Sequence, residues 1–319
     1  MKRIISVSRR TDVPAFYGQW FLNRIHEGFA GVTNPFGGKK HIISLKPEDV
    51  SCFVFWSKNF APFLDNLKII EKLGYDFYFN YTITALPSEF ETNVNRPEAI
   101  EALKHLSRQY SPKHINWRFD PIIISSITDR DFYINSFKKL ASQLDGLVER
   151  CYISFVTVYN KVVRNFAAFE TANRIKFLDW PIEAKVDLAN ELADIAQCHG
   201  IKMYSCCGEY LAKGGNKIKK AHCIDGDLIE KLFYPDGFKY NMKPTRDECG
   251  CTQSSDIGTY DTCPHACIYC YANANKETAL KRAKQHDAHS AFLGYNKNDS
   301  DMWIKQKSEK QQFEFPGCI

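Results

Sequence analysis

Three cysteines near the end of the chain are the residues whose type and spacing best suit chemistry. They form the run Cys263-Pro-His-Ala-Cys267-Ile-Tyr-Cys270, a Cys-x3-Cys-x2-Cys spacing. Zinc loops usually pair cysteines as Cys-x2-Cys and complete a tetrahedron of four protein ligands. An iron–sulfur cubane also accepts thiolates, and three thiolates on four irons leave one iron open. We therefore expect a 4Fe–4S cluster at Cys263, Cys267 and Cys270, with a zinc knuckle or metal-free thiols as the alternatives.

This run, with Tyr269 directly before its last cysteine, resembles the cluster motif of radical S-adenosylmethionine (SAM) enzymes. The stretches at 8–12, 55–59, 117–121 and 249–273 extend the resemblance over nearly the whole chain, to an uncharacterised family with this motif at its C-terminal end. Ordinary radical SAM enzymes carry the motif near the start of a barrel, so the position here implies a circular permutation. In broad outline the chain is also distantly similar to spore photoproduct lyase.

The resemblance implies an activity and its cofactors. In radical SAM chemistry SAM chelates the open iron, and one electron cleaves a carbon–sulfur bond to give a 5′-deoxyadenosyl radical that abstracts hydrogen from a substrate. By resemblance Tyr269 would lie near the adenine of SAM. The implied partners are an electron donor such as flavodoxin or ferredoxin and an unassigned substrate, either a small molecule or one derived from nucleic acid.

Short apolar segments alternate with helical patterns from the N-terminus onward, which is typical of βα units around a parallel sheet. We expect strands at 3–8, 52–56, 76–84, 114–119, 151–158, 201–205 and 256–260, with helices between most of them. The predicted fold is α/β, a TIM-like (β/α) barrel, full or partial, circularly permuted and with a Cys-rich insertion. We expect one domain with βα units over 1–205, a Cys-rich loop region over 206–255, and the last strand, cluster loop and C-terminal helix over 256–319.

Polar side chains follow most of these strands, at the end where barrel enzymes place their active sites. The usual glycine-rich SAM motif is absent after the cysteines, and in a permuted fold the first strand would lie beside the last. The candidates to hold the polar end of SAM are therefore the residues after strand one: Ser8, Arg9, Arg10 and Asp12. Lys58 and Asn59, after the second strand, are the alternative for the SAM carboxylate.

Further candidates follow the later strands. Arg118 offers a planar fork for a substrate carboxylate or phosphate. Asp120 is its expected partner, and a purely structural salt bridge is the alternative for this pair. Tyr159 and Glu209 follow the fifth and sixth strands and are the remaining catalytic candidates, together with Lys58.

A second group of cysteines precedes the main motif, at positions 206, 207, 223, 249 and 251. Adjacent cysteines rarely bind one metal together, so we expect either Cys206 or Cys207 to be spare. Cys207, Cys223, Cys249 and Cys251 are the expected ligands of an auxiliary 4Fe–4S cluster. A zinc site of the same four, or reduced thiols, are the alternatives.

The amino-acid composition limits which class of protein this chain can be. The 319 residues include twelve cysteines, no run of about 18 apolar residues and no signal-peptide pattern, so we expect a cytoplasmic protein that uses cysteines for metals and has no membrane partner. The net charge of +5 is too small to indicate a partner. Lysine-rich runs at 213–220 and 276–284 support a rival function, a non-catalytic iron–sulfur or zinc protein that binds nucleic acid or another phosphate-rich ligand.

Overall fold

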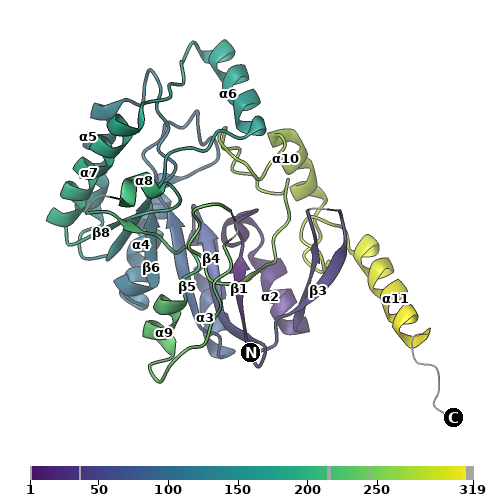
Figure 1. Ribbon diagram of the computed structural model, residues 1–319. Helices are drawn as coiled ribbons and strands as arrows, with labels where there is room; N and C mark the ends of the chain where they lie inside the picture. The colour runs from purple at the N-terminus through teal and green to yellow at the C-terminus, as the bar shows by residue number, and fades with distance from the viewer. Residues whose placement is uncertain (1, 36, 214–216, 245, 314–319) are drawn as a thin grey trace.

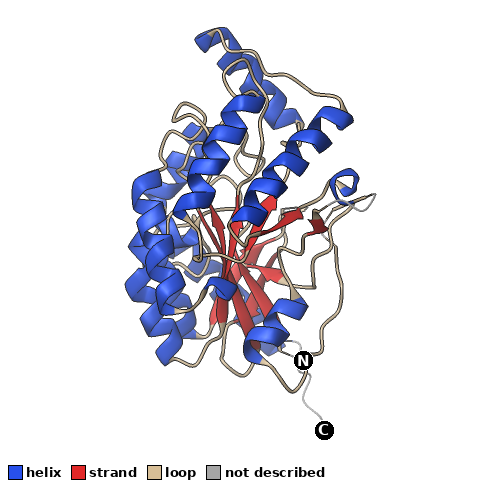
Figure 2. Ribbon diagram, turned by 90° about the vertical axis from the view of Figure 1, so that its left-hand side faces the viewer, coloured by secondary structure: helices blue, strands red, loops and turns tan. Residues whose placement is uncertain are grey.

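The centre of the fold is an eight-stranded sheet in which every neighbouring pair is parallel (Figure 2). The computed structural model describes residues 2–35, 37–213, 217–244 and 246–313. The strand order is β10-β1-β4-β5-β6-β7-β8-β9. The bounds are β1 (Arg3–Val7), β4 (Val50–Ser57), β5 (Phe77–Thr82), β6 (Ile115–Arg118), β7 (Arg150–Ile153), β8 (Lys202–Ser205), β9 (Lys219–Lys220) and β10 (Ser255–Asp256). A parallel α/β fold was therefore predicted correctly.

The sheet is open at both sides. In the described part of the chain β9 and β10 are the two edge strands, so the full-barrel alternative is not found. The predicted neighbour relation between the last and first strands is confirmed, because β10 pairs in parallel with β1 through Ile5↔Ser255 and Ser6↔Asp256. The residues after these two strands consequently lie at the same edge of the sheet.

Helices cover one face of this sheet (Figure 2). They are α2 (Gly18–Glu27), α3 (Leu64–Lys72), α4 (Arg96–Gln109), α5 (Arg130–Gln143) and α7 (Ile182–Cys198). Because strand side chains alternate between faces, Phe53 and Phe55 pack toward these helices while Cys52 and Val54 point the other way. Asn95 and Asp129 begin α4 and α5 by accepting backbone N–H groups, as N-cap residues do.

The Cys-rich segment covers the opposite face, the one that would line a barrel. Tyr78, Tyr152 and Val54 form a second core with residues 221–251, which include α9 (Gly226–Phe233). Both faces of the central strands are thus buried, which explains why a strand such as Cys52-Phe-Val-Phe is continuously apolar. The segment predicted as a loop insertion therefore packs on the sheet and shares a hydrophobic core with it.

Several elements were not predicted. The antiparallel hairpin β2 (Phe29–Thr33) and β3 (Lys40–Ser44) holds the C-terminal region, since the Gly31 N–H donates to the Ala291 carbonyl at 2.8 Å. A Cβ on Gly31 would approach the Phe292 ring to 2.6 Å, so only glycine allows this packing. Figure 1 shows the hairpin between the sheet and the last helix. Other unpredicted elements include α6 (Asn160–Asn173), α8 (Glu209–Ala212) and α11 (Lys297–Phe313), together with β9 and α9 in the segment expected to be a loop.

Two smaller elements lie close to the predicted positions. The short helix α1 (Val13–Phe16) starts after its cap Asp12, and α10 (Lys276–Gln285) matches the helix expected over 275–286. Within the described ranges we find no helix with the length and apolarity that crossing a bilayer requires.

Candidate metal and active site

The loop that carries Cys263, Cys267 and Cys270 follows β10 and lies across the carboxyl ends of the neighbouring strands. Its backbone carbonyls accept hydrogen bonds from side chains of segments far apart in the sequence. Tyr17 Oη donates to the Thr262 carbonyl at 2.5 Å, Asn93 Nδ2 to Pro264 at 2.8 Å and Asn165 Nδ2 to Ile268 at 3.0 Å. These bonds fix an irregular loop that makes few backbone bonds of its own.

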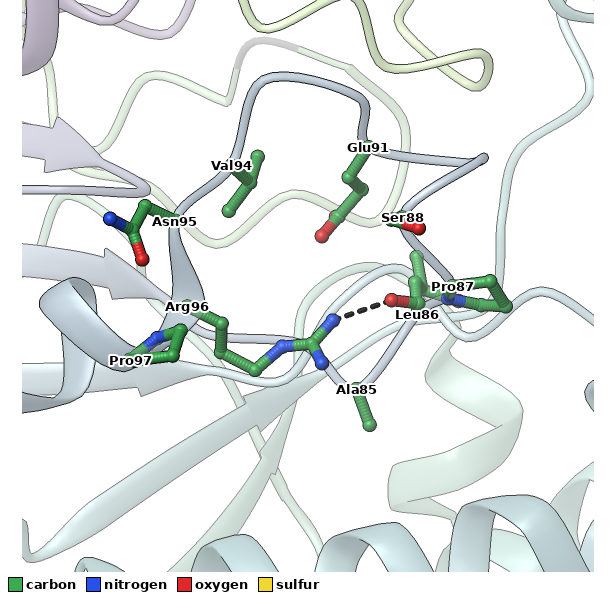
Figure 3. Close-up of a pocket in the computed structure, with 9 residues that line it drawn as sticks. All are labelled: Ala85, Leu86, Pro87, Ser88, Glu91, Val94, Asn95, Arg96 and Pro97. Atoms are coloured by element: carbon green, nitrogen blue, oxygen red, sulfur yellow. Dashed lines mark hydrogen bonds between the residues drawn. The ribbon is translucent and has the colours of Figure 1, made fainter.

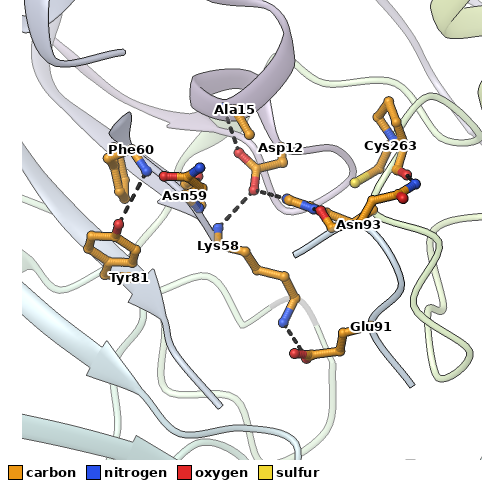
Figure 4. Close-up of polar contacts among 12 residues, drawn as sticks. Asp12, Ala15, Lys58, Asn59, Phe60, Tyr81, Glu91, Asn93 and Cys263 are labelled. Carbon is orange, nitrogen blue, oxygen red and sulfur yellow. Dashed lines mark hydrogen bonds and ion pairs between the residues drawn. The ribbon is translucent and has the colours of Figure 1, made fainter. Parts of the chain in front are cut away.

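Asp12 joins this loop to the first two strands (Figure 4). Its Oδ1 accepts the Ala15 N–H at 3.0 Å as the cap of α1, and its Oδ2 accepts the Lys58 N–H at 2.8 Å. The same Oδ2 lies 2.7 Å from Nε2 of His265, inside the cysteine loop, and both side chains are buried. Asp12, predicted to hold SAM, therefore already has three partners within the protein.

A second buried pair supports the other end of the loop. Lys58 Nζ lies 2.6 Å from Oε1 of Glu91, which also accepts from the Tyr269 hydroxyl, while Thr84 Oγ1 donates to Oε2 at 2.7 Å. Burial opposes the charged carboxylate, but Lys58 outweighs it and holds the pKa of Glu91 below its usual value. Glu91 also forms an isolated β-bridge with Cys267. Tyr269, in the cysteine loop, and Lys58, after β4, thus meet at the Glu91 carboxylate.

Glu91 was not among the predicted site residues. It stands in the irregular stretch 83–95 between β5 and α4, and a long loop after the carboxyl end of a strand was the signal that could have indicated it. A cavity of about 330 Å³ is lined by Glu91 and by neighbouring residues in 85–97. Figure 3 shows these residues, with Arg96 bonded to the Leu86 carbonyl. Its size is at the lower end for ligand pockets.

The three cysteine side chains are close enough to affect one another electrostatically. Burial raises the pKa of Cys263 and Cys270, and raises the pKa of Cys267 to about 12, with Lys58 opposing this shift at Cys267. Without a metal these thiols are therefore protonated at neutral pH. Within the described ranges, no three His, Cys, Asp or Glu side chains already stand in a geometry that could hold a metal ion. Binding would require the thiols to turn toward a common centre.

The remaining candidates after strand one surround Asp256 at the end of β10. Its carboxylate accepts Ser8 Oγ at 2.6 Å and the Arg9 N–H at 2.9 Å, and Arg9 and Arg10 form ion pairs with it at 3.7 and 3.9 Å. Burial would raise the pKa of Asp256, but the two arginines hold it below its usual value. A Cβ on Gly258 would lie 2.0 Å from Ser8 Oγ, so glycine is required where this chain leaves β10.

Arg118 and Asp120 form the predicted pair, at the end of β6. Arg118 Nη2 bonds to Asp120 Oδ2, which also accepts Ser154 Oγ at 3.1 Å. Burial raises the pKa of Asp120, although Arg118 opposes the shift. The guanidinium lies 5.0 Å from the centre of the Trp56 ring and donates to Cys223 Sγ at 2.8 Å. Arg118 therefore connects the substrate-side candidates to the second group of cysteines.

The other predicted residues are spread more widely. Asn59 donates to Glu98 Oε2 at 2.5 Å and accepts the Ala61 N–H, so its amide shapes the start of the helix after β4. Tyr159 is partly exposed and its ring lies 6.2 Å from that of Tyr271. Glu209 is half-exposed and pairs with Lys220 at 2.9 Å, which lowers its pKa.

The structure brings the second group of cysteines together, Cys206 included, while their role as metal ligands stays a prediction. Cys206 Sγ lies 3.0 Å from Cys223 Sγ, and both are buried. Cys207, Cys249 and Cys251 complete the group through further sulfur contacts. Cys206, rather than a spare residue, is one of its inner members.

Comparisons with known proteins place this chain in a family. Residues 4–272 match the family described as Domain of unknown function (DUF1848). The chain belongs to this family. The family description names no reaction and no cofactor, and a search of curated proteins gives no match.

Two solved structures that match in part are D-hydantoinases. The enzyme from Bacillus sp. AR9 is 9% identical, with a TM-score of 0.29, and the match covers 52% of this chain and 36% of that one. A second D-hydantoinase is 9% identical, with a TM-score of 0.30, and the match covers 67% of this chain and 45% of the other. This chain thus spans less than half of either hydantoinase, and we infer nothing about its fold or activity from likenesses this weak.

Proposed function

We propose that this protein is a radical SAM-type enzyme on a permuted, open (β/α) scaffold. The observation that supports this most is the loop of three thiols, held at the carboxyl edge of the sheet by the buried Lys58–Glu91 ion pair and by the buried contact between Asp12 and His265. A 4Fe–4S cluster bound by three thiolates keeps one iron open for a cofactor. With SAM bound there, such a cluster supplies reductive cleavage to a 5′-deoxyadenosyl radical.

The residues present suit a cofactor at this edge. The Oγ1 of Thr11 and the Nε1 of Trp56 are buried without hydrogen-bond partners in the described structure, after β1 and near the end of β4. Buried polar atoms normally find a partner, so these two are candidates to meet a bound ligand. Lys58 places a positive charge beside Cys267 and over the Tyr269 ring at 5.6 Å, which favours an anionic thiolate cluster.

The contacts within the protein suggest different roles for the predicted residues: positioning the cysteine loop, binding SAM and facing the substrate. Asp12, through His265, and Glu91, through Tyr269, would hold the cysteine loop in place. Arg9 and Arg10, which lie about one-fifth exposed beside Asp256, would be the residues that reach the carboxylate of SAM. Arg118, backed by Asp120, would face the substrate side.

The first experiment is anaerobic reconstitution with iron and sulfide, followed by metal analysis and by reduction with dithionite in the presence of SAM. The Cys267→Ala variant should contain about four fewer irons per chain than wild type and should form no 5′-deoxyadenosine. Cys198→Ala is the matched control, because Cys198 is exposed at the end of α7 and belongs to neither cysteine group. It should retain both the iron and the activity.

The result that would overturn this proposal is equally specific. Equal iron contents in Cys267→Ala and Cys198→Ala would remove the cluster from this loop. A loop cluster that leaves SAM intact under reduction would instead support the non-catalytic iron–sulfur protein. In that case binding of a single-stranded oligonucleotide should depend on the lysine runs and weaken steeply with salt.

A further inference from the structure

The second group of cysteines forms a closed ring of sulfur contacts. Cys206 contacts Cys207 and Cys223, Cys223 contacts Cys251, and Cys249 contacts both Cys251 and Cys207. None of these cysteines is in a disulfide. Five thiols from three separate segments are therefore gathered at one place, on the face of the sheet opposite the helices.

The main chain around the ring is held by specific contacts with the sheet. The Tyr78 hydroxyl and Asn80 Nδ2 both donate to the Cys223 carbonyl at 2.9 Å, from β5. Glu248 Oε2 accepts the N–H groups of Gly208 and Glu209 at 2.6 and 3.0 Å, which ties the segment of Cys249 to that of Cys206. The convergence of the sulfurs is thus built into the fold.

Two guanidinium groups face the sulfurs. Arg118 donates to Cys223 Sγ at 2.8 Å, and Arg246 Nε donates to Cys207 Sγ at 3.0 Å, with its Nη2 3.8 Å from Cys206 Sγ. Neutral thiols are weak acceptors, whereas thiolates accept strongly from charged donors. Four thiolates around a divalent ion carry a net charge of −2, and both guanidinium groups aim N–H donors at these sulfurs, although Asp120 already pairs with Arg118.

We propose that this ring is a metal centre, closed by four thiolates and separate from the loop of Cys263, with Cys206, Cys223, Cys249 and Cys251 as ligands. Cys206 is preferred to Cys207 because it is buried in contact with Cys223, and both are near Arg118. Cys207 is more exposed and has a left-handed backbone, with φ of 56°. It would be the fifth, non-ligating thiol.

The spacing of the sulfurs favours a single tetrahedral ion such as zinc. A zinc–sulfur bond of about 2.3 Å places the sulfurs of a tetrahedron about 3.8 Å apart. The 3.0 Å between Cys206 and Cys223 would then open by about 0.8 Å, which side-chain rotation can supply. A four-iron cluster places several atoms between its thiolates and would require a larger displacement.

Such a centre would position Arg118 for the proposed active site. The guanidinium bonds Cys223 with one nitrogen and Asp120 with another, and Asp120 acts electrostatically on Lys58 beside Cys267. The two cysteine groups are thereby linked through charged side chains at one edge of the sheet. The metal centre itself does not depend on SAM chemistry and stands without it.

The test measures zinc and iron in the full-length protein purified anaerobically without added metal. We expect about one zinc per chain, retained in Cys267→Ala and in Cys207→Ala but lost in Cys223→Ala and Cys206→Ala. Failure of the function proposed above would instead remove SAM cleavage, or iron at the loop, and leave this zinc in place.

A spectroscopic measurement keeps the test valid if Cys223→Ala does not fold. Metal-free Cys267→Ala, in which the five cysteines are intact, is titrated with Co²⁺ and examined for thiolate-to-cobalt charge-transfer absorption of a tetrathiolate site. Its absence, together with no zinc in wild type, would refute the metal centre. If wild type holds iron and sulfide at this site in place of zinc, and Cys223→Ala loses them, the assignment to a single ion is refuted. If Cys206→Ala retains zinc and Cys207→Ala loses it, the choice of Cys206 as ligand is refuted.

Discussion

Replacing Glu91 by glutamine tests whether the buried Lys58–Glu91 pair supports the cysteine loop. Glu91 is 3% exposed, and its two oxygens accept from Lys58, Thr84 and Tyr269. Glutamine keeps the shape but offers one oxygen instead of two and no charge. Lys58, with 13% of its side chain exposed, would lose its carboxylate partner in a largely buried position.

The expected loss follows from this burial. Removing one partner of a buried ion pair typically costs about 3–5 kcal/mol, because the other charge is left uncompensated. Glu101→Gln is the matched control: Glu101 pairs with Lys104 at a similar distance of 2.7 Å, but its side chain is 71% exposed. An exposed pair of this kind contributes about 0–1 kcal/mol.

Urea denaturation of the metal-free protein under reducing, anaerobic conditions measures both losses without interference from a cluster. A Lys58→Met/Glu91→Gln double variant should lose less stability than the sum of the two single variants, since it leaves no unpaired buried charge. Equal unfolding free energies for Glu91→Gln and Glu101→Gln, or additive losses in the double variant, would refute the supporting role of the pair.

Two further predictions concern the first helix and a half-buried histidine. Asp12→Asn should lower iron retention after reconstitution several-fold because His265 loses its carboxylate partner, whereas Asp129→Asn, at the cap of α5, should retain iron. Burial lowers the pKa of His286 to about 4, so the neutral ring stabilises the fold above about pH 6.5, and this contribution is lost as the pH falls toward 4. Replacing His286 by glutamine (His286→Gln) should therefore make stability depend less on pH between 7 and 4, as measured by thermal denaturation. The control is His26→Gln, because His26 lies at an exposed position.

Much of the scaffold could be predicted because its signals are local. Apolar β-rich segments separated by capped helices led to the parallel order of β1, β4, β5, β6, β7 and β8. The hairpin β2–β3 was missed because its contacts are with residues near 291, far along the chain. The strands expected at 76–84 and 151–158 end earlier, at Thr82 and Ile153, where pairing with the neighbouring strands stops.

The candidate site, like the fold, could be predicted from the sequence only in part. Sequence spacing alone singled out Cys263, Cys267 and Cys270, because side chains within one short loop must stay close wherever the loop lies. The cysteine group at 206–251 was singled out by its number of cysteines and by the close pair Cys249 and Cys251. Only the tertiary structure decided that Glu91 lies beside Lys58, that His265 meets Asp12 and that Cys206 faces Cys223. These pairs join residues tens to hundreds of positions apart. Their proximity depends on strand order and on the Cys-rich segment closing the open face of the sheet, which no local spacing determines.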